Sequence, residues 1–315
     1  MLEVKNLTKH YGEIKALSDV SFTVNKGEIV GFLGPNGAGK STAMNIITGY
    51  IAPTSGGVSI SGFDVASNSK EIKKIVGFLP EIPPLYTEMT VTEYLNFVAE
   101  LKKVPKKEIN EHVKDVLDRA NIYNVKGRLI RNLSKGYRQR VGVAQALVGN
   151  PDVIILDEPT VGLDPNQIQE MRKLIRSLKK NHTVILSTHI LSEASAVCDK
   201  IIIINEGRIV TTETKSDLYD KYSLTNKIFL KVEGLEDEIY DILSGISNIQ
   251  KISKNKSKEK DVAEFVIEHE NGDVRKEIFF AMSKKEYPIL EMSSSNMSLE
   301  DIFMKVVSGK KGGEK

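Results

Sequence analysis

The sequence has few of the features that direct a protein to an oxidising compartment or into a membrane. Its 315 residues include one cysteine, Cys198, which excludes an internal disulfide and any metal site built from several cysteines. A single thiol is typical of a reducing compartment. No window approaches the roughly 20 apolar residues that a membrane-spanning helix needs, and the first residues lack the basic-then-apolar pattern of a signal peptide. We therefore expect any role at a membrane to depend on a partner.

A strong charge of either sign is also missing. Lys and Arg number 44 and Asp and Glu number 42, which leaves a formal net charge of +2. So weak a field gives no argument for nucleic acid, and we expect no nucleic-acid partner. The lysine-rich stretch 254–260 falls between two expected strands, so a solvated hairpin tip explains it better than a binding patch. With 40% hydrophobic and 27% charged residues, the chain has the composition of a globular protein of about two domains.

Residues 1–221 predict an α/β domain. Apolar runs such as "VIIL" at 153–156 and "IIII" at 201–204 have the length of buried strands, and amphipathic segments separate them. Buried strands that alternate with helices indicate a mainly parallel sheet. Residues 1–30 and 53–80 show the shorter alternation of strands joined by turns, which predicts an antiparallel β subdomain. The strand that contains "IIII" is expected to close the domain near Leu218.

A helical insertion is predicted at residues 87–133. The segments "TVTEYLNFVAELKKV" and "PKKEINEHVKDVLDRANI" carry apolar residues at helical spacing, and Pro105 occupies a helix-start position in the second. Another helix is expected after Ser134, where apolar residues recur three and four positions apart. These helices together predict a helical subdomain at about residues 87–150.

Residues 222–315 predict a smaller second domain and a tail. Their segments read in order as strand, helix, strand, strand, helix and strand. That order is the split βαβ plait of a ferredoxin-like α+β domain. A last amphipathic helix, "SLEDIFMKVVSG", and the polar tail "KKGGEK" are expected to finish the chain.

The segment "GFLGPNGAGKST" matches the phosphate-binding pattern G-x-x-x-x-G-K-[ST], between an expected strand and an expected helix. Glycines let successive backbone N–H groups point at phosphate oxygens, Lys40 supplies a charge to the β- and γ-phosphates, and the Ser41 hydroxyl can ligate Mg²⁺. A simple glycine turn before a helix would not require the Lys-Ser pair. The residues expected to hold the nucleotide are Gly34, Pro35, Asn36, Gly37, Ala38, Gly39, Lys40, Ser41 and Thr42.

Two carboxylates follow the buried strand "VIIL". Asp157 can hold magnesium through water, and Glu158 can orient and deprotonate an attacking water. Taken alone, Glu158 could be a surface carboxylate, but the phosphate-binding segment favours hydrolysis. GTPases carry an Asn-Lys-x-Asp guanine reader, and the nearest matches, "NKIF" at 226 and "NKSK" at 255, lack its aspartate. We therefore expect ATP as the nucleotide.

A second anion site is predicted in "LSKGYRQR". Ser134 is a natural N-cap for the helix that follows it, and the N–H groups after the cap would face an anion along the helix dipole. The chain thus has two places for phosphate, about a hundred residues apart.

With the phosphate-binding segment, "LSKGYRQR" and "VIILDEPTVGLDP" following one another in that order, the sequence resembles the ATP-binding cassette of ABC transporters over residues 2 to about 220. The resemblance implies an Mg²⁺-dependent ATPase in which Glu158 is the catalytic carboxylate and His189, in "LSTHI", is the switch histidine. Asp164 matches the D-loop "GLDP", and Tyr11 matches the aromatic residue that stacks on adenine. Without the resemblance, His189 could be a structural histidine, Tyr11 could pack on an edge strand, and Asp164 could be a turn residue before a proline.

Two positions depart from the family pattern. The family signature usually has two glycines after its serine, whereas Lys135, Gly136 and Tyr137 follow Ser134 here, so the N–H donors remain and a positive charge is added. At the position of a glutamine that contacts Mg²⁺ and links to the membrane subunit, this chain has Glu81. Either the carboxylate of Glu81 does that work or the coupling loop is tuned differently; we expect the former.

The resemblance also implies partners. In the family, two cassettes face head to tail, so each ATP lies between one phosphate cradle and residues 134–136 of the other chain. We therefore expect a homodimer that energises a separate transmembrane permease at the cytoplasmic face of the cell membrane. The C-terminal plait is similar to the accessory domain of single-cassette exporters of the drug-efflux and gliding-motility type, which favours export.

Two other readings stay open. The first is a soluble ABC-type ATPase that acts on ribosomes or chromosomes. However, ribosome-acting members normally fuse two cassettes, and chromosome-acting members insert a long coiled coil. The second is a P-loop regulator that binds ATP without hydrolysing it, against which Glu158 and His189 argue.

Overall fold

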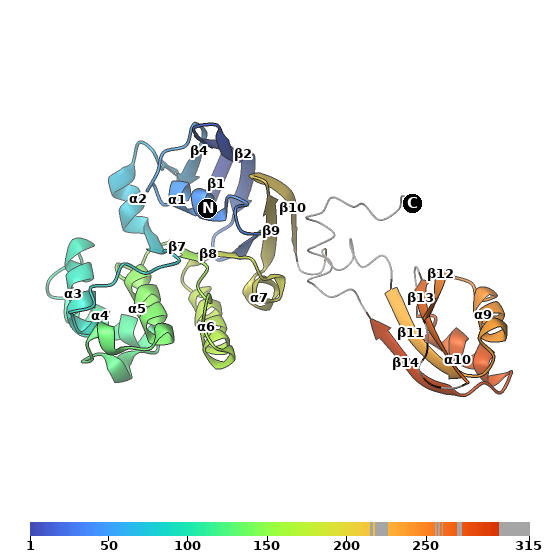
Figure 1. Ribbon diagram of the computed structural model, residues 1–315. Helices are drawn as coiled ribbons and strands as arrows, with labels where there is room; N and C mark the ends of the chain where they lie inside the picture. The colour runs from blue at the N-terminus through green and yellow to red at the C-terminus, as the bar shows by residue number, and fades with distance from the viewer. Residues whose placement is uncertain are drawn as a thin grey trace. The chain divides into compact units, whose positions relative to one another are not determined.

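The chain divides into two compact units, Met1–Lys215 and Ser216–Lys315, in the computed structural model (Figure 1). The structure describes residues 1–214, 217, 226–255, 257, 259, 261–269 and 273–295. The segment 298–309, for which the sequence predicts an amphipathic helix, lies outside the described residues. Each unit is described separately below.

A six-stranded sheet forms the centre of the first unit, in the order β10-β9-β3-β8-β7-β6. The neighbours from β9 to β6 are parallel, and β10 pairs antiparallel with β9. Every residue of β3, β7 and β8 is buried, so the predicted parallel sheet with buried strands is confirmed. The strands are β3 (Ile29–Leu33), β6 (Val76–Leu79), β7 (Val153–Asp157), β8 (Thr183–Thr188), β9 (Lys200–Asn205) and β10 (Arg208–Thr214). The edge strand β10 follows the strand that we expected to be the last one of the domain.

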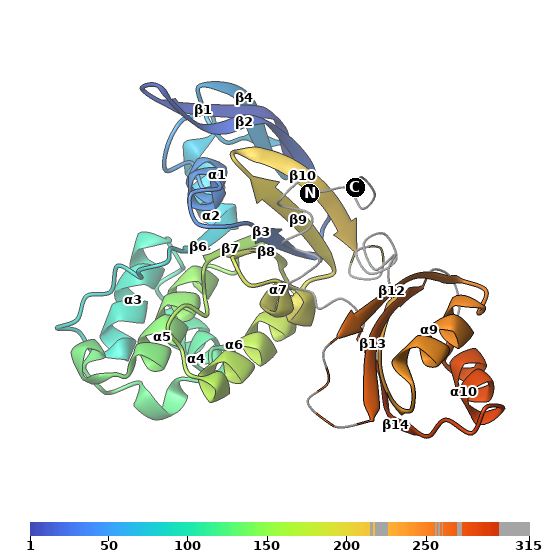
Figure 2. The same cartoon turned by 45° about the vertical axis from the view of Figure 1, so that its right-hand side comes forward.

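A smaller antiparallel sheet covers one side of this centre (Figure 2). Its order is β2-β1-β4-β5, with β1 (Leu2–Tyr11), β2 (Ile14–Val24), β4 (Ser55–Ile60) and β5 (Phe63–Asp64). Helix α1 (Lys40–Ile47) buries Met44 and Ile47 in the core that the two sheets share. In that core the rings of Phe22 and Phe32 lie 5.5 Å apart. The predicted β subdomain is confirmed.

Helix α2 (Ser69–Ile75) interrupts the stretch in which we expected only short strands. Its sequence, "SKEIKKI", has only two apolar residues, Ile72 and Ile75, and this single pair is too short an apolar period to indicate a helix. Packing rather than sequence pattern therefore identifies this helix.

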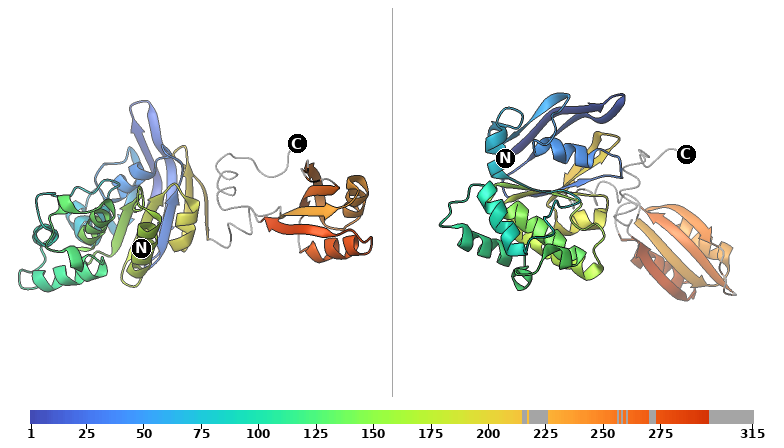
Figure 3. Two further views of the ribbon diagram at one scale, coloured as in Figure 1. Left: turned by 60° about the horizontal axis from the view of Figure 1, so that its bottom comes forward. Right: turned by 60° about the vertical axis from the view of Figure 1, so that its left-hand side comes forward.

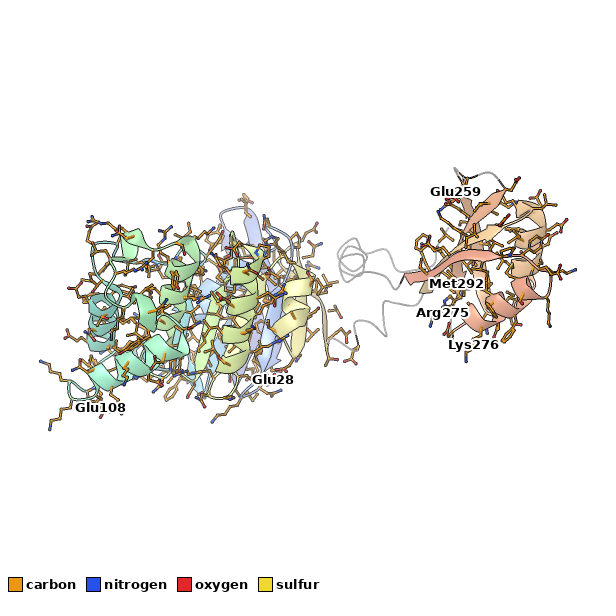
Figure 4. The ribbon with its side chains drawn as sticks, turned by 90° about the horizontal axis from the view of Figure 1, so that it is seen from below. Glu28, Glu108, Glu259, Arg275, Lys276 and Met292 are labelled. Carbon is orange, nitrogen blue, oxygen red and sulfur yellow. The ribbon has the colours of Figure 1, made fainter. Side chains whose placement is uncertain are left out.

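The predicted helical subdomain contains α3 (Val91–Leu101), α4 (Ile109–Arg119) and α5 (Lys135–Leu147), with short 3₁₀ turns at Tyr123–Val125 and Ile130–Asn132. Thr90 and Glu93 form a capping box that fixes the start of α3. Helix α4 begins at Ile109 and not at Pro105, because a turn in which the Glu108 N–H bonds to the Pro105 carbonyl precedes it. Glu108 is labelled on this part of the molecule in Figure 4.

Helix α5 lies unusually close to the edge strand β6. A Cβ on Gly77 of β6 would overlap the carbonyl oxygen of Ala146, and a Cβ on Gly142 of α5 would lie 2.5 Å from a methyl carbon of Leu79. The two glycines therefore allow an approach that side chains would prevent. We call this contact the glycine seam.

Two further helices complete the first unit. They are α6 (Pro165–Leu178), which follows β7, and α7 (Leu191–Val197), which follows β8. Both bury an apolar side against the sheet, with Met171 and Ile175 from α6 and Ala194 from α7.

In the second unit, the described residues from 226 to 295 form an antiparallel sheet with two helices on one face (Figure 3). Its strand order is β12-β13-β11-β14, which with the helices gives the ferredoxin-like plait that the sequence predicts. The elements are β11 (Asn226–Glu233), α9 (Glu236–Ser244), β12 (Ile249–Asn255), β13 (Val262–His269), α10 (Arg275–Ser283) and β14 (Ile289–Ser295). Phe265 and Ile278 lie in its separate core.

The lysine-rich stretch 254–260 begins with Lys254 in β12, and its other lysines, at 256, 258 and 260, lie outside the described residues. Lys254 bonds to Asp237 at 2.6 Å and lies 3.2 Å from Glu236, both on α9. Between β12 and β13, Glu259, labelled in Figure 4, approaches Lys231 at 3.8 Å. The charges of Lys254 and Glu259 therefore pair within the second unit.

One buried histidine of the first unit predicts how stability depends on pH. The His182 ring is 3% exposed, with Nδ1 2.6 Å from the Pro151 carbonyl oxygen and Nε2 beside Arg119. Burial lowers the pKa of His182 below its ordinary value of 6.5, and Arg119 acts in the same direction. As the pH falls below 6.5, the unfolded chain takes up a proton that the folded chain refuses, so the free energy of unfolding decreases.

We expect His182→Gln to flatten this dependence, measured by urea unfolding between about pH 5 and pH 7.5. Burial also lowers the pKa of His112, so the slope should shrink rather than vanish. An unchanged slope in the His182→Gln variant would contradict the assignment.

Candidate functional site

The phosphate cradle, residues 34–42, joins the buried end of β3 to α1. Gly37 and Gly39 have φ angles of 80° and 103°, in the left-handed region that favours glycine. Added to Gly39, a Cβ would lie 2.6 Å from the Ala16 carbonyl oxygen, so the strand after the β1–β2 hairpin packs directly against the cradle. Lys40 begins α1, and its ammonium donates to the carbonyls of Gly34 at 2.9 Å and Pro35 at 3.2 Å. The lysine therefore lies inside the curve of its own loop.

Three predicted site residues meet beside the cradle. The Lys40 ammonium lies 3.4 Å from one carboxylate oxygen of Glu158, and Nδ1 of His189 lies 3.0 Å from the other. Lys40 and Glu158 are 6% exposed, whereas the His189 side chain is 40% exposed. Glu158 and His189 directly follow β7 and β8, and Lys40 begins the helix after the cradle that follows β3, so the three side chains meet at the carboxyl ends of neighbouring strands, where open α/β sheets bind their ligands.

Asp157 and Glu158 share a partner that the sequence reasoning missed. The Ser187 hydroxyl donates to an Asp157 carboxylate oxygen and accepts the Glu158 N–H at 2.9 Å. Both contacts follow from the pairing of β7 with β8, which sets Asp157 opposite Ser187. The sequence shows the Ser187 hydroxyl in "ILST", but only the register of β7 and β8 shows that this hydroxyl faces Asp157.

The backbone of Glu158 adopts a φ of 48°, in the left-handed region. For a residue with a side chain this conformation costs roughly 1–2 kcal/mol. Such strain persists where the surroundings hold it in place, and it gathers at functional sites. Ser187 holds the Glu158 N–H, so the strained residue is fixed on its backbone as well as on its carboxylate.

The predicted magnesium ligands lie at the same edge. Ser41 is exposed in the first turn of α1, and Glu81 is exposed just after β6, the strand next to β7. Mg²⁺ bound with a nucleotide usually needs only one or two protein carboxylates, because phosphates and waters supply its other ligands. Ser41 and Asp157 fit that demand. Within the part of the chain that the structure describes, no group of three or more His, Cys, Asp or Glu side chains is arranged to hold a metal ion.

Tyr11 ends β1 and is 49% exposed. The Lys9 ammonium lies 5.2 Å from the centre of its ring. The half-exposed ring is accessible from solvent, and its predicted stacking on adenine stays a proposal.

The predicted helix cap at Ser134 is confirmed. Ser134 is the N-cap of α5, and its hydroxyl accepts the Tyr137 N–H at 3.4 Å. Ser134 and Lys135 are exposed, while Gly136 is buried against Gln167, whose side-chain amide carbon would lie 2.6 Å from an added Cβ.

The segment 162–165 lies beside this cap. The Lys135 ammonium covers Gly162, and Asp164 caps α6 by accepting the Gln167 N–H at 2.9 Å. An ion pair between Arg140 and Glu170 joins α5 to α6 a turn further on. A pocket of about 230 Å³ opens here, lined among others by Ser134, Gly136, Gln167 and Glu170.

The site residues therefore fall into two clusters. Lys40, Asp157, Glu158 and His189 surround the cradle, whereas residues 134–137 and 162–165 form the other cluster. Among the described residues, no hydrogen bond or ion pair joins residues 134–137 to residues 34–42. Two half-sites for phosphate lie on one chain.

Comparison with known proteins identifies the family of this chain. A family profile described as "ABC transporter" matches residues 17–161. The chain is 33% identical to YxlF of Bacillus subtilis (strain 168), an uncharacterized ABC transporter ATP-binding protein, over 98% of this chain and 99% of YxlF. The chain belongs to the ABC transporter ATP-binding proteins. It is also 33% identical to the bacitracin transport ATP-binding protein BcrA of Bacillus licheniformis, over 98% of each chain.

Solved structures agree with this assignment. An ATP-binding subunit of an ABC transporter matches with a TM-score of 0.64 and 33% identity, over 71% of this chain and 94% of that chain. The cassette MJ0796, in a dimeric post-hydrolysis state with ADP and phosphate, matches with a TM-score of 0.62 and 30% identity, over 68% of this chain and 98% of that chain. The protein is thus an ATP-binding cassette of the P-loop fold and an ATPase, as the sequence predicts.

No helix among the described residues of this ABC ATPase is long and apolar enough to cross a membrane.

One substitution in this ABC ATPase tests whether the cradle binds ATP. Lys40→Ala should weaken ATP binding by on the order of 10- to 100-fold, because a charge-assisted contact to phosphate of roughly 1.5–3 kcal/mol is lost. Isothermal titration calorimetry gives the dissociation constant. Lys74→Ala, which removes an exposed lysine from α2, serves as the matched control and should bind ATP normally. An unaltered dissociation constant for Lys40→Ala would exclude the cradle role.

Proposed function

We propose that two copies of this protein close head to tail around two ATP molecules, and that hydrolysis energises a separate transmembrane permease of an exporter. The observation that carries the proposal is the division into half-sites. The cap at Ser134 offers backbone N–H donors and the charge of Lys135 at an exposed surface, next to residues 162–165. A phosphate held by the cradle of a second copy is the anion that this surface fits.

The relatives support this arrangement. MJ0796 forms a dimer with ADP and phosphate, and BcrA, which matches over almost the whole chain, is described as a bacitracin transport protein. The ferredoxin-like second unit, similar to the accessory domain of single-cassette exporters, favours export. We infer that the protein works at the cytoplasmic face of the cell membrane.

The chemistry follows from the residues beside the cradle. Lys40 carries positive charge to the β- and γ-phosphates, and Glu158 accepts the proton of the attacking water. His189 holds the Glu158 carboxylate from its other oxygen, which fixes the base in line with the cradle. Mg²⁺, held by Ser41 and Asp157, would supply charge to the phosphate oxygens.

The partner's half-site completes this machinery. Backbone N–H groups after Ser134 and the ammonium of Lys135 bind the γ-phosphate from the second copy, so ATP binds both copies at once and favours the closed dimer. Loss of the γ-phosphate removes that bridge, and the dimer opens. ATP binding and hydrolysis thereby switch the dimer between a closed and an open arrangement, and a permease bound to the dimer can change conformation with it.

The segment between Glu81 and α3 is the surface we assign to the permease. Ile82 is 83% exposed and Tyr86 is 53% exposed, although both are apolar or aromatic. The Tyr86 ring packs 5.4 Å from Phe97 of α3, so the segment connects the nucleotide edge to the helical subdomain. An exposed apolar surface next to Glu81, which we expect to contact Mg²⁺, is suited to bind a partner and to transmit a conformational change to it.

Mixing two inactive variants tests the shared pocket. Lys40→Ala disables the cradle, and Ser134→Arg blocks the opposing half-site. Each variant alone should lose ATPase activity, because both pockets of its dimer are defective. In a dimer with one copy of each, one pocket receives both lesions and the other receives none. An equimolar mixture should therefore recover about a quarter of the wild-type rate, if half of the dimers are mixed and pockets act independently.

A mixture that stays inactive, although cross-linking shows mixed dimers, would exclude a pocket built from two copies. Activity of Ser134→Arg alone at the wild-type rate would exclude it as well.

The acidic residue before the exposed segment gives another prediction. Glu81→Gln should leave basal hydrolysis within a few-fold, because the glutamine keeps an oxygen ligand, but should change the stimulation of hydrolysis by the permease. The measurement compares phosphate release by the protein alone with release by the reconstituted complex. Glu111→Gln, which alters an exposed carboxylate of α4 outside the assigned segment, is the control. Abolished basal activity in Glu81→Gln would show that the charge is needed for the chemistry.

A further inference from the structure

Glu193 is a buried carboxylate that the mechanism above does not use. It lies in the first turn of α7, four residues after His189, and is 6% exposed. Figure 2 shows α7 beside the central sheet of the first unit. One of its oxygens accepts the hydroxyl of Thr160 at 2.5 Å and the hydroxyl of Thr188 at 3.3 Å. Among the described residues, no lysine, arginine or histidine forms an ion pair with it.

Thr188 places this carboxylate next to the switch histidine. It is the last residue of β8, and His189 follows it. Its hydroxyl donates to Glu193 and accepts the Ile190 N–H at 3.1 Å. The residues directly before and after His189 are therefore both held by hydrogen bonds. The start of the loop is thereby fixed on both sides of the residue that contacts Glu158.

Thr160 places the same carboxylate at the start of the D-loop. Its carbonyl accepts the Leu163 N–H at 3.2 Å, which closes the turn containing Gly162 with its φ of 68°. Asp164 follows as the N-cap of α6. The segment that starts at Thr160 therefore leads straight to the surface that we assign to the second copy.

The energetics argue against a role in stability alone. Burying a carboxylate that has only hydroxyl donors costs more free energy than burying an apolar side chain of similar size. Leu191, Ala194 and Val197 already supply the apolar contacts of α7. What a carboxylate at this position adds is two hydrogen bonds, from Thr160 at the start of the D-loop and from Thr188 next to His189.

We propose that Glu193 is a positioning residue that couples the D-loop to the switch histidine, so that contact with the second copy sets how His189 meets Glu158. The inference rests on the proposed function, because it needs the D-loop to face a second copy. Glu193 itself makes no described contact with the side chain of Glu158 or His189, so it acts through its neighbours and not on ATP.

The test separates kcat from KM in variants of Glu193. Glu193→Ala should lower kcat by about 10- to 100-fold, because misplacement of a catalytic group by about 1 Å has effects of that size. The KM for ATP should stay within about threefold, since the cradle is untouched. Glu193→Gln should stay within about threefold of the wild type, because an amide oxygen can accept both threonine hydroxyls.

A double-mutant comparison shows whether Glu193 acts through His189. Added to His189→Ala, Glu193→Ala should reduce kcat by less than about twofold further, because residues that act as one unit are not additive. Equal losses in both backgrounds, or a Glu193→Gln variant as impaired as Glu193→Ala, would overturn the proposal. Ser195→Ala is the matched control: Ser195 is buried on the same helix, and its hydroxyl has no hydrogen-bond partner.

Two further measurements keep the outcomes distinct. If Glu193→Ala does not fold, Thr188→Val removes one hydroxyl at nearly constant volume and should give the same selective loss of kcat; an unchanged kcat in this variant would overturn the proposal. If His189→Ala keeps the wild-type rate, the proposed chemistry fails together with this inference. If His189→Ala is impaired and the mixed-variant dimers recover activity, but Glu193→Ala is normal, only the role of Glu193 fails.

Discussion

The site depends on the Glu158 carboxylate, which lies between an ammonium and an imidazole. Lys40 lies 3.4 Å from one of its oxygens and His189 3.0 Å from the other. In surroundings where the lysine and the carboxylate are almost fully buried, such a pair is costly unless both partners are well placed. The parallel sheet provides that placement, because the segments that follow three neighbouring strands, β3, β7 and β8, carry the three side chains at one edge of the sheet.

The same edge holds residues that do no chemistry. Ser187 fixes the carboxylate of Asp157 and the strained backbone of Glu158. Glu193 fixes the loops on either side through two threonines. Catalytic side chains need positions accurate to a fraction of an ångström, and such supporting hydrogen bonds supply that accuracy.

Much of this fold follows from local sequence. Buried strands, the amphipathic α3 and α5, the Ser134 cap and the order of elements in the second unit all have short-range signals, namely apolar period and capping chemistry. The charged helix α2 and the edge strand β10 lack such signals, and the start of α4 was placed too early because Pro105 belongs to a preceding turn. Their positions depend on tertiary packing.

The candidate site divides in the same way. Lys40, Asp157 and Glu158 could be proposed from motifs, because phosphate binding requires particular residues at fixed spacing. Ser187 and Glu193 could not, because their meaning lies in which strand faces which and in hydroxyls that meet only in three dimensions. Sequence reasoning finds the groups that we propose to act on ATP, and the structure is needed to find the residues that hold those groups in place.

The glycine seam between β6 and α5 has a consequence for the second copy. Gly77 and Gly142 let the helix rest against the strand, and the N-terminus of that helix carries Ser134. A methyl group at either glycine would overlap atoms across the seam, and because the interior is close-packed, the helix would have to move away from the strand. In the proposed head-to-tail dimer, such a substitution would leave the phosphate cradle of its own chain intact and would displace the Ser134 cap from the cradle of the second copy.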